Sequence, residues 1–227
     1  MRGREYWVKT LGEGWAMQLR PLLKDPSMDS LMDKLAMEYA MNKVMPYNQS
    51  TVFDALRLCP WDKLQIVIIG TEPNTLSGVG PLAYSDIMFT AMNPAVCQIR
   101  NCLERQNKTL LLDFDTTMVE WAERGVLLLN RSLTCRVGEP RSHRDLWKQF
   151  FGSVVYNILK YKPETPIVLW GKEAQVYSEL LSQDHPVFSW EHPMKANSEY
   201  RNWECPNFEQ IDQYRKSIGK DKLDGRK

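Results

Sequence analysis

Residues 64–74 read Leu-Gln-Ile-Val-Ile-Ile-Gly-Thr-Glu-Pro-Asn, and the rest of the chain is arranged around this stretch. Its short apolar, β-branched run is typical of a buried strand. The Gly-Thr-Glu-Pro that follows ends the strand, because proline has no N–H to donate to a β-ladder. Glu72 is therefore expected at the carboxyl end of a strand, where α/β proteins bind ligands. It is either a catalytic carboxylate or a structural one that caps a turn or pairs with a cation.

Three further apolar runs of this kind occur downstream, at residues 126–130, 166–170 and 187–190. Connections of helical length separate the four runs. Short strands that alternate with helices indicate a parallel sheet covered on both faces. The sequence therefore predicts an α/β fold, a three-layer α/β/α arrangement with a central four-stranded, mainly parallel sheet.

Helices are expected over residues 1–20, 26–45, 51–57, 94–106, 116–124 and 142–159, the first of them covering the sheet. In the second, Met28, Leu31 and Leu35 recur at helical spacing, and Pro46 ends the pattern. Gly125 is expected to close the fifth as its C′ residue. No linker or internal repeat is visible, so we predict one domain over residues 1–219 and a polar C-terminal tail over 220–227.

Composition excludes several classes of protein. Lys plus Arg (29) and Asp plus Glu (28) nearly cancel, so any contact with DNA has to be local. The five cysteines contain no C-x-x-C pair, which argues against a disulfide framework or a zinc ribbon. No phosphate-binding glycine motif follows any strand, which argues against a nucleotide-binding enzyme. No long apolar run or signal peptide is present, so we expect an intracellular protein, cytoplasmic or nucleoid-associated, without a membrane partner.

Polar groups follow separate strands of the predicted sheet. Glu72, Asn130 and His192 each stand at or just after a strand end, and Tyr84 lies shortly after the first. Each has an ordinary structural explanation when it is taken alone. Of the other histidines, His143 is expected to anchor a loop and His185 to lie at the surface.

Together with their surroundings, these residues resemble the uracil-DNA glycosylase family over most of the chain. Residues 70–75 read Gly-Thr-Glu-Pro-Asn-Thr where that family has Gly-Gln-Asp-Pro-Tyr-His, and 82–85 read Leu-Ala-Tyr-Ser. The strongest match is Gly-Val-Leu-Leu-Leu-Asn at 125–130, followed by Leu133-Thr134 and Ser142-His143. Trp-Gly-Lys-Glu-Ala-Gln at 170–175 and His192-Pro193 follow in the family's order.

The resemblance implies a monofunctional DNA glycosylase that hydrolyses the N-glycosidic bond of a flipped-out pyrimidine and leaves an abasic site. It implies single- or double-stranded DNA as the partner, no cofactor, no metal and a monomeric enzyme. The implied catalytic residues are Glu72 and His192. The implied base-binding residues are Thr71, Asn74, Tyr84 and Asn130. The implied DNA-binding residues are Asn93, Ala95, Gly171, Lys172, Met194, Lys195 and Ala196.

The chain departs from the family pattern in its first loop. Glu72 replaces an aspartate, Thr75 replaces a histidine, and the loop before Tyr84 is one residue shorter. Asn74 stands where the family has the tyrosine that excludes the C5 methyl group of thymine. Ala196 stands where the family has the leucine that enters the gap left by the flipped base, so Met194 or Lys195 would have to fill it.

The change at residue 74 leads to a hypothesis about the substrate. A pocket without the tyrosine would accept C5-substituted bases such as thymine, 5-hydroxymethyluracil or 5-hydroxymethylcytosine, with or without glucose. Such an activity would serve DNA repair or defence against modified phage DNA. Two alternatives remain open, an ordinary uracil-DNA glycosylase and a catalytically silent DNA-binding or interaction module.

Overall fold

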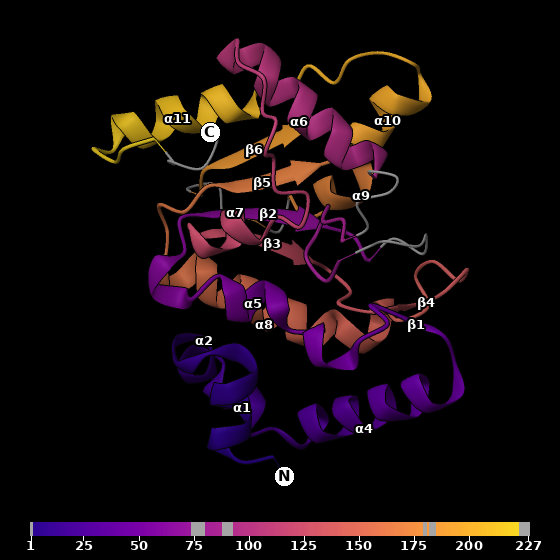
Figure 1. Cartoon of the computed structure of the whole chain (residues 1–227). Helices are drawn as coiled ribbons and strands as arrows, with labels where there is room; N and C mark the ends of the chain where they lie inside the picture. Colours follow the sequence, from indigo (N-terminus) through magenta and orange to yellow (C-terminus); the bar gives the residue numbers. More distant parts are fainter. Residues whose placement is uncertain (1, 74–79, 88–92, 179–180, 182–184, 223–227) are drawn as a thin grey trace.

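The computed structural model describes residues 2–73, 80–87, 93–178, 181 and 185–222 (Figure 1). Its central sheet has four strands in the order β3-β2-β5-β6, and every neighbouring pair is parallel. The strands are β2 (Ile66–Gly70), β3 (Val126–Asn130), β5 (Ile167–Trp170) and β6 (Val187–Trp190). Helices flank this sheet, which confirms the predicted three-layer α/β/α fold and the predicted strands.

The helices lie in groups on either side of the sheet. In Figure 1, α6 and α11 lie above β5 and β6, α5 and α8 lie below β3, and α1, α2 and α4 form the lowest part of the view. The α-helices are α1 (Arg4–Leu11), α2 (Glu13–Gln18), α3 (Arg20–Leu23), α4 (Pro26–Met41), α5 (Asp54–Leu58), α6 (Pro94–Asn107), α7 (Val119–Glu123), α8 (Arg144–Tyr161), α9 (Lys172–Gln175), α10 (Pro193–Ser198) and α11 (Asn207–Ser217). Two short strands, β1 (Val44–Met45) and β4 (Cys135–Arg136), pair in antiparallel fashion, and single turns of 3₁₀ helix occupy Gln49–Thr51 and Trp61–Lys63.

The N-terminal region differs from its prediction. The single helix expected over residues 1–20 is broken at Gly12, whose φ of 85° lies in the left-handed region that ends a helix. Its first part, α1, contacts α2 and α5. Helix α5 lies between α1 and the sheet, so α1 does not cover the sheet directly (Figure 1). Helix α4 ends at Met41 because the chain then becomes extended to pair with β4.

The parallel register brings the functional part of the chain to one edge. Gly70 at the end of β2 pairs with Asn130 at the end of β3, and Trp170 pairs with Trp190 at the ends of β5 and β6. Because all four strands run in the same direction, the segments that follow them emerge side by side. Glu72, Asn130 and His192 therefore lie at the same edge of the sheet.

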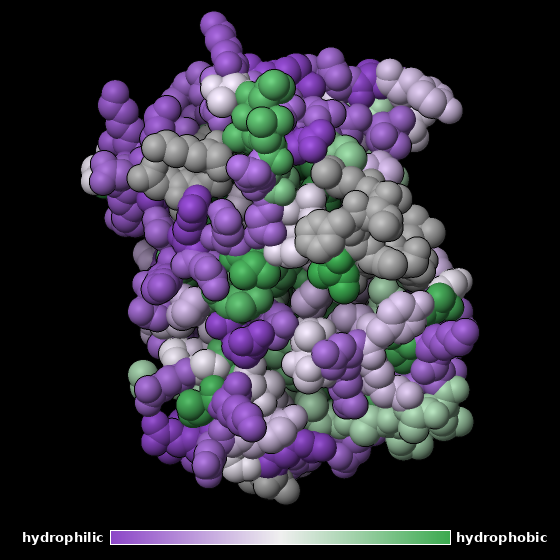
Figure 2. All heavy atoms as spheres, in the orientation of Figure 1, coloured by the Kyte–Doolittle hydropathy of each residue, from purple (hydrophilic) through white to green (hydrophobic). Residues whose placement is uncertain are grey.

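The core runs continuously from the N-terminal helices through the sheet to α11. Its largest fully buried side chains are those of Trp15, Trp147, Trp170 and Trp203. On the face drawn in Figure 2, hydrophilic residues predominate and hydrophobic residues form separate patches. None of the helices within the described ranges has the length and apolar character that crossing a membrane requires.

Gly125 lets the chain enter β3 in a conformation that other residues rarely adopt. Its φ is 97°, and a Cβ there would lie 2.1 Å from the backbone oxygen of Lys63.

We expect Gly125→Ala to lower the free energy of unfolding by about 1–3 kcal/mol or more. The matched control is Gly152→Ala, whose added methyl group meets nothing within 4 Å. In the middle of α8, this control should raise stability by about 0.5–1 kcal/mol. Urea denaturation would show both effects, and equal shifts in the two variants would contradict this account.

Candidate active site

A cavity of about 250 Å³ opens at the carboxyl edge of the sheet. The ends of β2 and β3, the segment around Tyr84 and the starts of α6 and α10 line it. Five of the predicted catalytic and base-binding residues meet there, namely Thr71, Glu72, Tyr84, Asn130 and His192. Pockets for drug-sized ligands measure roughly 300–1,000 Å³, so this cavity suits a single small ring system.

Asn130 provides hydrogen-bonding groups at the floor of the cavity. It is the last residue of β3, and only 3% of its surface is exposed. Its partner in the register, Gly70, leaves the space that the amide occupies, since a Cβ at residue 70 would lie 2.3 Å from Asn130 Oδ1. A carboxamide offers two donors and an acceptor, which is the set needed to read the edge of a base.

Tyr84 forms a wall of the cavity. Its φ of 65° is unusual for a large side chain and fixes the direction of the ring. The ring lies 5.3 Å from that of Trp170 and 5.5 Å from that of His192, measured between centroids. Trp170 packs in turn on Trp203, with centroids 4.8 Å apart, so a cluster of edge-to-face aromatic rings packs against Tyr84. Burial raises the pKa of the Tyr84 hydroxyl, which stays protonated.

His192 is held as a hydrogen-bond donor. It caps the N-terminus of α10, where its Nδ1 accepts the N–H of Met194 at 3.1 Å. In the neutral ring the proton must therefore sit on Nε2. Burial lowers the pKa of His192, which favours this neutral form. Gly171 makes the close packing possible, since a Cβ at residue 171 would lie 2.8 Å from His192 Cβ.

Glu72 is oriented by a backbone amide. Its Oε2 accepts the N–H of Arg141 at 2.8 Å, from the segment between β4 and α8. The following residue, Pro73, accepts a hydrogen bond from the Cys135 thiol through its carbonyl at 3.1 Å. Within the described residues the second carboxylate oxygen of Glu72 makes no hydrogen bond. The carboxylate therefore has one fixed oxygen and one that can bind another group.

Sequence reasoning did not find Arg141, Ser85 or Pro140, which also belong to this site. Ser85 follows Tyr84 directly and lies in the segment that matches the family, so a signal for it existed. Arg141 acts through its main-chain N–H, which every residue except proline carries, so its side chain gives no signal.

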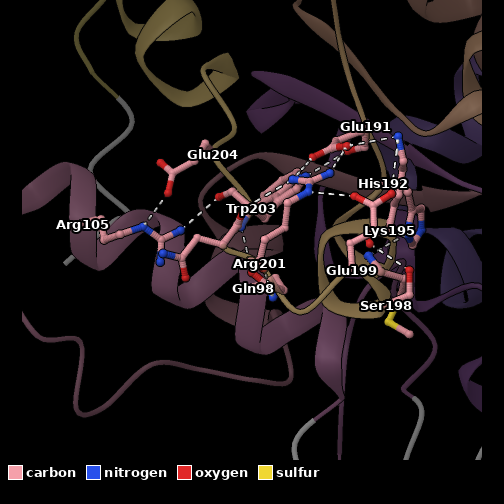
Figure 3. Close-up of polar contacts among 12 residues, drawn as sticks. Gln98, Arg105, Glu191, His192, Lys195, Ser198, Glu199, Arg201, Trp203 and Glu204 are labelled. Atoms are coloured by element: carbon pink, nitrogen blue, oxygen red, sulfur yellow. Dashed lines mark hydrogen bonds and ion pairs between the residues drawn. The ribbon is translucent and has the colours of Figure 1, made fainter.

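Figure 3 shows how the loop that carries His192 is fastened to α6. Glu191 pairs with Arg201 through both carboxylate oxygens, and its backbone oxygen accepts the indole N–H of Trp203 at 2.9 Å. The backbone N–H of Trp203 donates to Gln98 of α6 at 2.9 Å. The Arg201 guanidinium keeps the pKa of Glu191 below its usual value. The position of His192 thus depends on contacts across the surface of α6.

The predicted DNA-binding residues occupy different environments. Asn93, Ala95 and Met194 line the cavity, and Asn93 caps α6 by accepting the N–H of Ala95 at 2.9 Å. Lys172 and Lys195 are exposed, and the Lys195 amine lies 3.7 Å from the Glu191 carboxylate (Figure 3).

Several predicted residues lie in surroundings that the sequence did not reveal. Ala196 has no exposed surface, in a helix that packs closely on α6, and the expectation that it contacts DNA stays a prediction. His185 is also buried, with 7% of its surface exposed, rather than lying at the surface. His143 is buried and hydrogen-bonded to Thr134, which confirms that it anchors a loop. Asn74 and Thr75 lie outside the described residues.

The parallel sheet between helices, with a cavity at its carboxyl edge, defines the chain as a three-layer α/β/α protein. It is similar to a solved structure of mimivirus uracil-DNA glycosylase with a TM-score of 0.79, at 17% identity over 93% of this chain and 86% of that one. It is also similar to the wild-type UNG structure from Nitratifractor salsuginis, with a TM-score of 0.60 and 16% identity, over 83% of this chain and 87% of that one.

Sequence comparison extends this from the fold to the family. The uracil-DNA glycosylase of Chlamydia trachomatis serovar L2b is 30% identical over 221 residues, which cover 95% of each chain. That of Acinetobacter baumannii strain AYE is 30% identical over 223 residues, covering 94% of this chain and 92% of its own. The chain belongs to the uracil-DNA glycosylase family. No family model matches it.

The protonation state of His192 can be observed directly. We expect the neutral Nε2–H tautomer at neutral pH and titration below the ordinary histidine range, because burial lowers its pKa. Since the folded state binds this proton more weakly than the unfolded chain, the contribution to stability is present at neutral pH and is lost as the pH falls. A ¹⁵N NMR titration, with His192→Asn to assign the signal, would measure this. An imidazolium signal at neutral pH would contradict it.

Proposed function

We propose that this protein is a monofunctional DNA glycosylase that hydrolyses the N-glycosidic bond of a flipped-out pyrimidine and leaves an abasic site. The observation that carries this proposal is the convergence of Glu72, Tyr84, Asn130 and His192 in one base-sized cavity. The four residues come from four separate segments of a chain in the uracil-DNA glycosylase family. The curated relatives are named for this activity.

The target base has to leave the helix before it can react. Extruding a nucleotide from duplex DNA costs a few kcal/mol in lost stacking and pairing, and the pocket has to recover that energy. Stacking on Tyr84 would replace part of the lost stacking, because its ring is already held by Trp170. Asn130 would pair with the N3 and O4 edge of the pyrimidine through its donor and acceptor.

His192 acts on the leaving base. As the bond between C1′ and N1 breaks, negative charge collects on the base oxygens. A donor that meets this charge stabilises the transition state more than the bound substrate and therefore accelerates the reaction. What supports this role is the hydrogen bond from the Met194 N–H to Nδ1, which leaves Nε2–H free to donate to O2 of the base.

Glu72 acts on the other side of the broken bond. Positive charge develops on the deoxyribose, and a carboxylate stabilises it while it orients the attacking water. The N–H of Arg141 holds one oxygen of Glu72, which leaves the other for the water. The N–H of Arg141 also fixes the direction of this longer side chain, which stands where the family has aspartate.

The loops at the cavity mouth would hold the DNA backbone. Backbone amides, small polar groups and lysines contact phosphates without changing the net charge of the protein. We assign this role to the residues around Asn93, Ala95 and Gly171, and to the exposed Lys172 and Lys195. With Ala196 buried, Met194 or Lys195 would enter the gap that the flipped base leaves. The enzyme would act as a monomer, with residues 1–219 as one domain.

The substrate is expected to extend beyond uracil. Asn74 replaces the tyrosine that blocks C5 substituents in the family, so the pocket would admit thymine, 5-hydroxymethyluracil or modified cytosines. Excision of such bases would place the enzyme in repair or in defence against modified phage DNA.

A panel of oligonucleotides, each with one of these bases, tests the wider pocket. We expect alkali-labile sites at C5-substituted pyrimidines as well as at uracil. Asn74→Tyr should remove excision of the substituted bases and retain that of uracil, because the ring would occupy the space next to C5. Cleavage confined to uracil in the wild type would contradict the wider pocket and support an ordinary uracil-DNA glycosylase.

Glu72→Gln separates an enzyme from a silent binding module. We expect base release to fall about 10²- to 10⁴-fold, the usual contribution of a group that activates water. Fluorescence anisotropy should show DNA binding close to that of the wild type, since the amide keeps the shape of the side chain. Wild-type protein that binds DNA and releases no base from the panel would support the module.

A further inference from the structure

The backbone amide that orients Glu72 belongs to a segment with an unusual conformation. Arg141 has a φ of 69°, in the left-handed region that a large side chain rarely adopts. Such a conformation persists only where the surroundings hold it. The position of the Arg141 N–H, and with it that of the Glu72 carboxylate, therefore depends on what fastens residues 136–143.

One end of this segment is hydrogen-bonded to the carboxylate of Glu38 in α4, and the other end lies against the same carboxylate. The guanidinium of Arg136 donates to both oxygens of Glu38, from Nε and Nη2, at 2.7 Å each. At the other end, His143 Nε2 lies 3.2 Å from Glu38 Oε2. Asn42 also donates to Oε2, at 3.0 Å. The paired Arg136 lowers the pKa of Glu38 to about 2, so the carboxylate remains ionised under all ordinary conditions.

A buried hydrogen-bond chain fixes the orientation of His143. The indole N–H of Trp147 donates to Thr134 Oγ1 at 2.7 Å, and Thr134 Oγ1 lies 2.7 Å from His143 Nδ1. Since an indole can only donate, the Thr134 hydroxyl is free to give its own proton to Nδ1. The proton of a neutral His143 then sits on Nε2, which faces Glu38.

Further hydrogen bonds hold the part of the chain between these ends. The N–H of Arg136 donates to Ser142 Oγ at 2.8 Å, and the N–H of Glu139 donates to the Arg136 oxygen at 3.1 Å. The Arg141 side chain donates to Glu173 of α9 at 2.8 Å. Because Arg141 lies between the two residues that contact Glu38, loss of the bond at Glu38 would shift the amide that holds Glu72.

We infer that Glu38 is a positioning residue for Glu72, which acts through Arg136 and His143 on the Arg141 amide. This inference rests on the proposed function, because it explains the hydrogen bond from the Arg141 N–H to Glu72 by the proposed role of Glu72 in binding the attacking water. It makes α4, a helix outside the cavity, part of what the reaction requires. The predicted effect is on the chemical step and not on DNA binding, because Glu38 does not line the cavity.

Kinetics of Glu38→Gln test this. A misplacement of about 1 Å costs up to 10²-fold in rate, so we expect kcat to fall about 10- to 100-fold with little change in KM. The matched control is Glu13→Gln, which removes an exposed ion pair with Arg4 (3.2 Å) in the same N-terminal region. This control should keep wild-type kcat and KM. An unchanged kcat in folded Glu38→Gln would overturn the inference.

A double-mutant cycle shows whether Glu38 acts through Glu72. Combined with Glu72→Gln, Glu38→Gln should cause less than about a twofold further loss, because residues that act as one unit are not additive. A merely structural role would multiply the two losses, and that result would overturn the inference. If Glu38→Gln does not fold, Arg136→Lys serves in its place, because it keeps the positive charge and removes the bidentate hydrogen bonds to Glu38. The same losses of kcat are then expected for Arg136→Lys, alone and combined with Glu72→Gln.

Hydrogen exchange at the Arg141 amide gives a readout that needs no activity. We expect loss of protection there in Glu38→Gln and in Glu72→Ala, with the amides of β2 and β5 unchanged. If the wild type releases no base, the proposed function fails while this measurement still tests the coupling. If the wild type is active and Arg141 keeps its protection in Glu38→Gln, the coupling alone fails.

Discussion

The parallel pairing of β2 with β3, in which Gly70 lies opposite Asn130, is the constraint on which the rest of the site depends. It places the ends of two strands level with each other, and the glycine leaves the space that the Asn130 amide fills. A shift of the register by one residue would turn the side chains of a strand to the opposite face of the sheet. The position of the cavity therefore depends on the backbone register of β2 and β3. The side chains that line it then supply the chemistry.

The functional groups at this edge are held by main-chain contacts more than by neighbouring charges. The N–H of Met194 sets the tautomer of His192, and the N–H of Arg141 orients Glu72. The ion pairs of Glu191 with Arg201 and of Glu38 with Arg136 do not include His192 or Glu72 and instead hold the segments around them. In the contacts of His192 and Glu72 the partner is a neutral N–H, which does not compete with a charged transition state as an opposite charge would.

Much of the fold could be predicted because its signals are local. Four apolar runs gave the strands to within a residue or two, and a polar residue or a glycine stood at or just after each strand end. The N-terminal helices were predicted less well, since Gly12 breaks a pattern that remains periodic on both sides. The burial of Ala196 depends on the contact between α10 and α6, which the short sequence around it does not record.

The sequence by itself determined which residue types reach the edge of the sheet, because strand length and chain direction fix where a strand ends. It also determined the membership of the family, through segments that keep their order along the chain. Only the tertiary structure decided how these groups are held. The contact between Glu38 and Arg136 joins residues 98 positions apart, and Arg141 contributes an N–H that nearly every residue has. No local pattern encodes such contacts, since they arise when distant segments pack together.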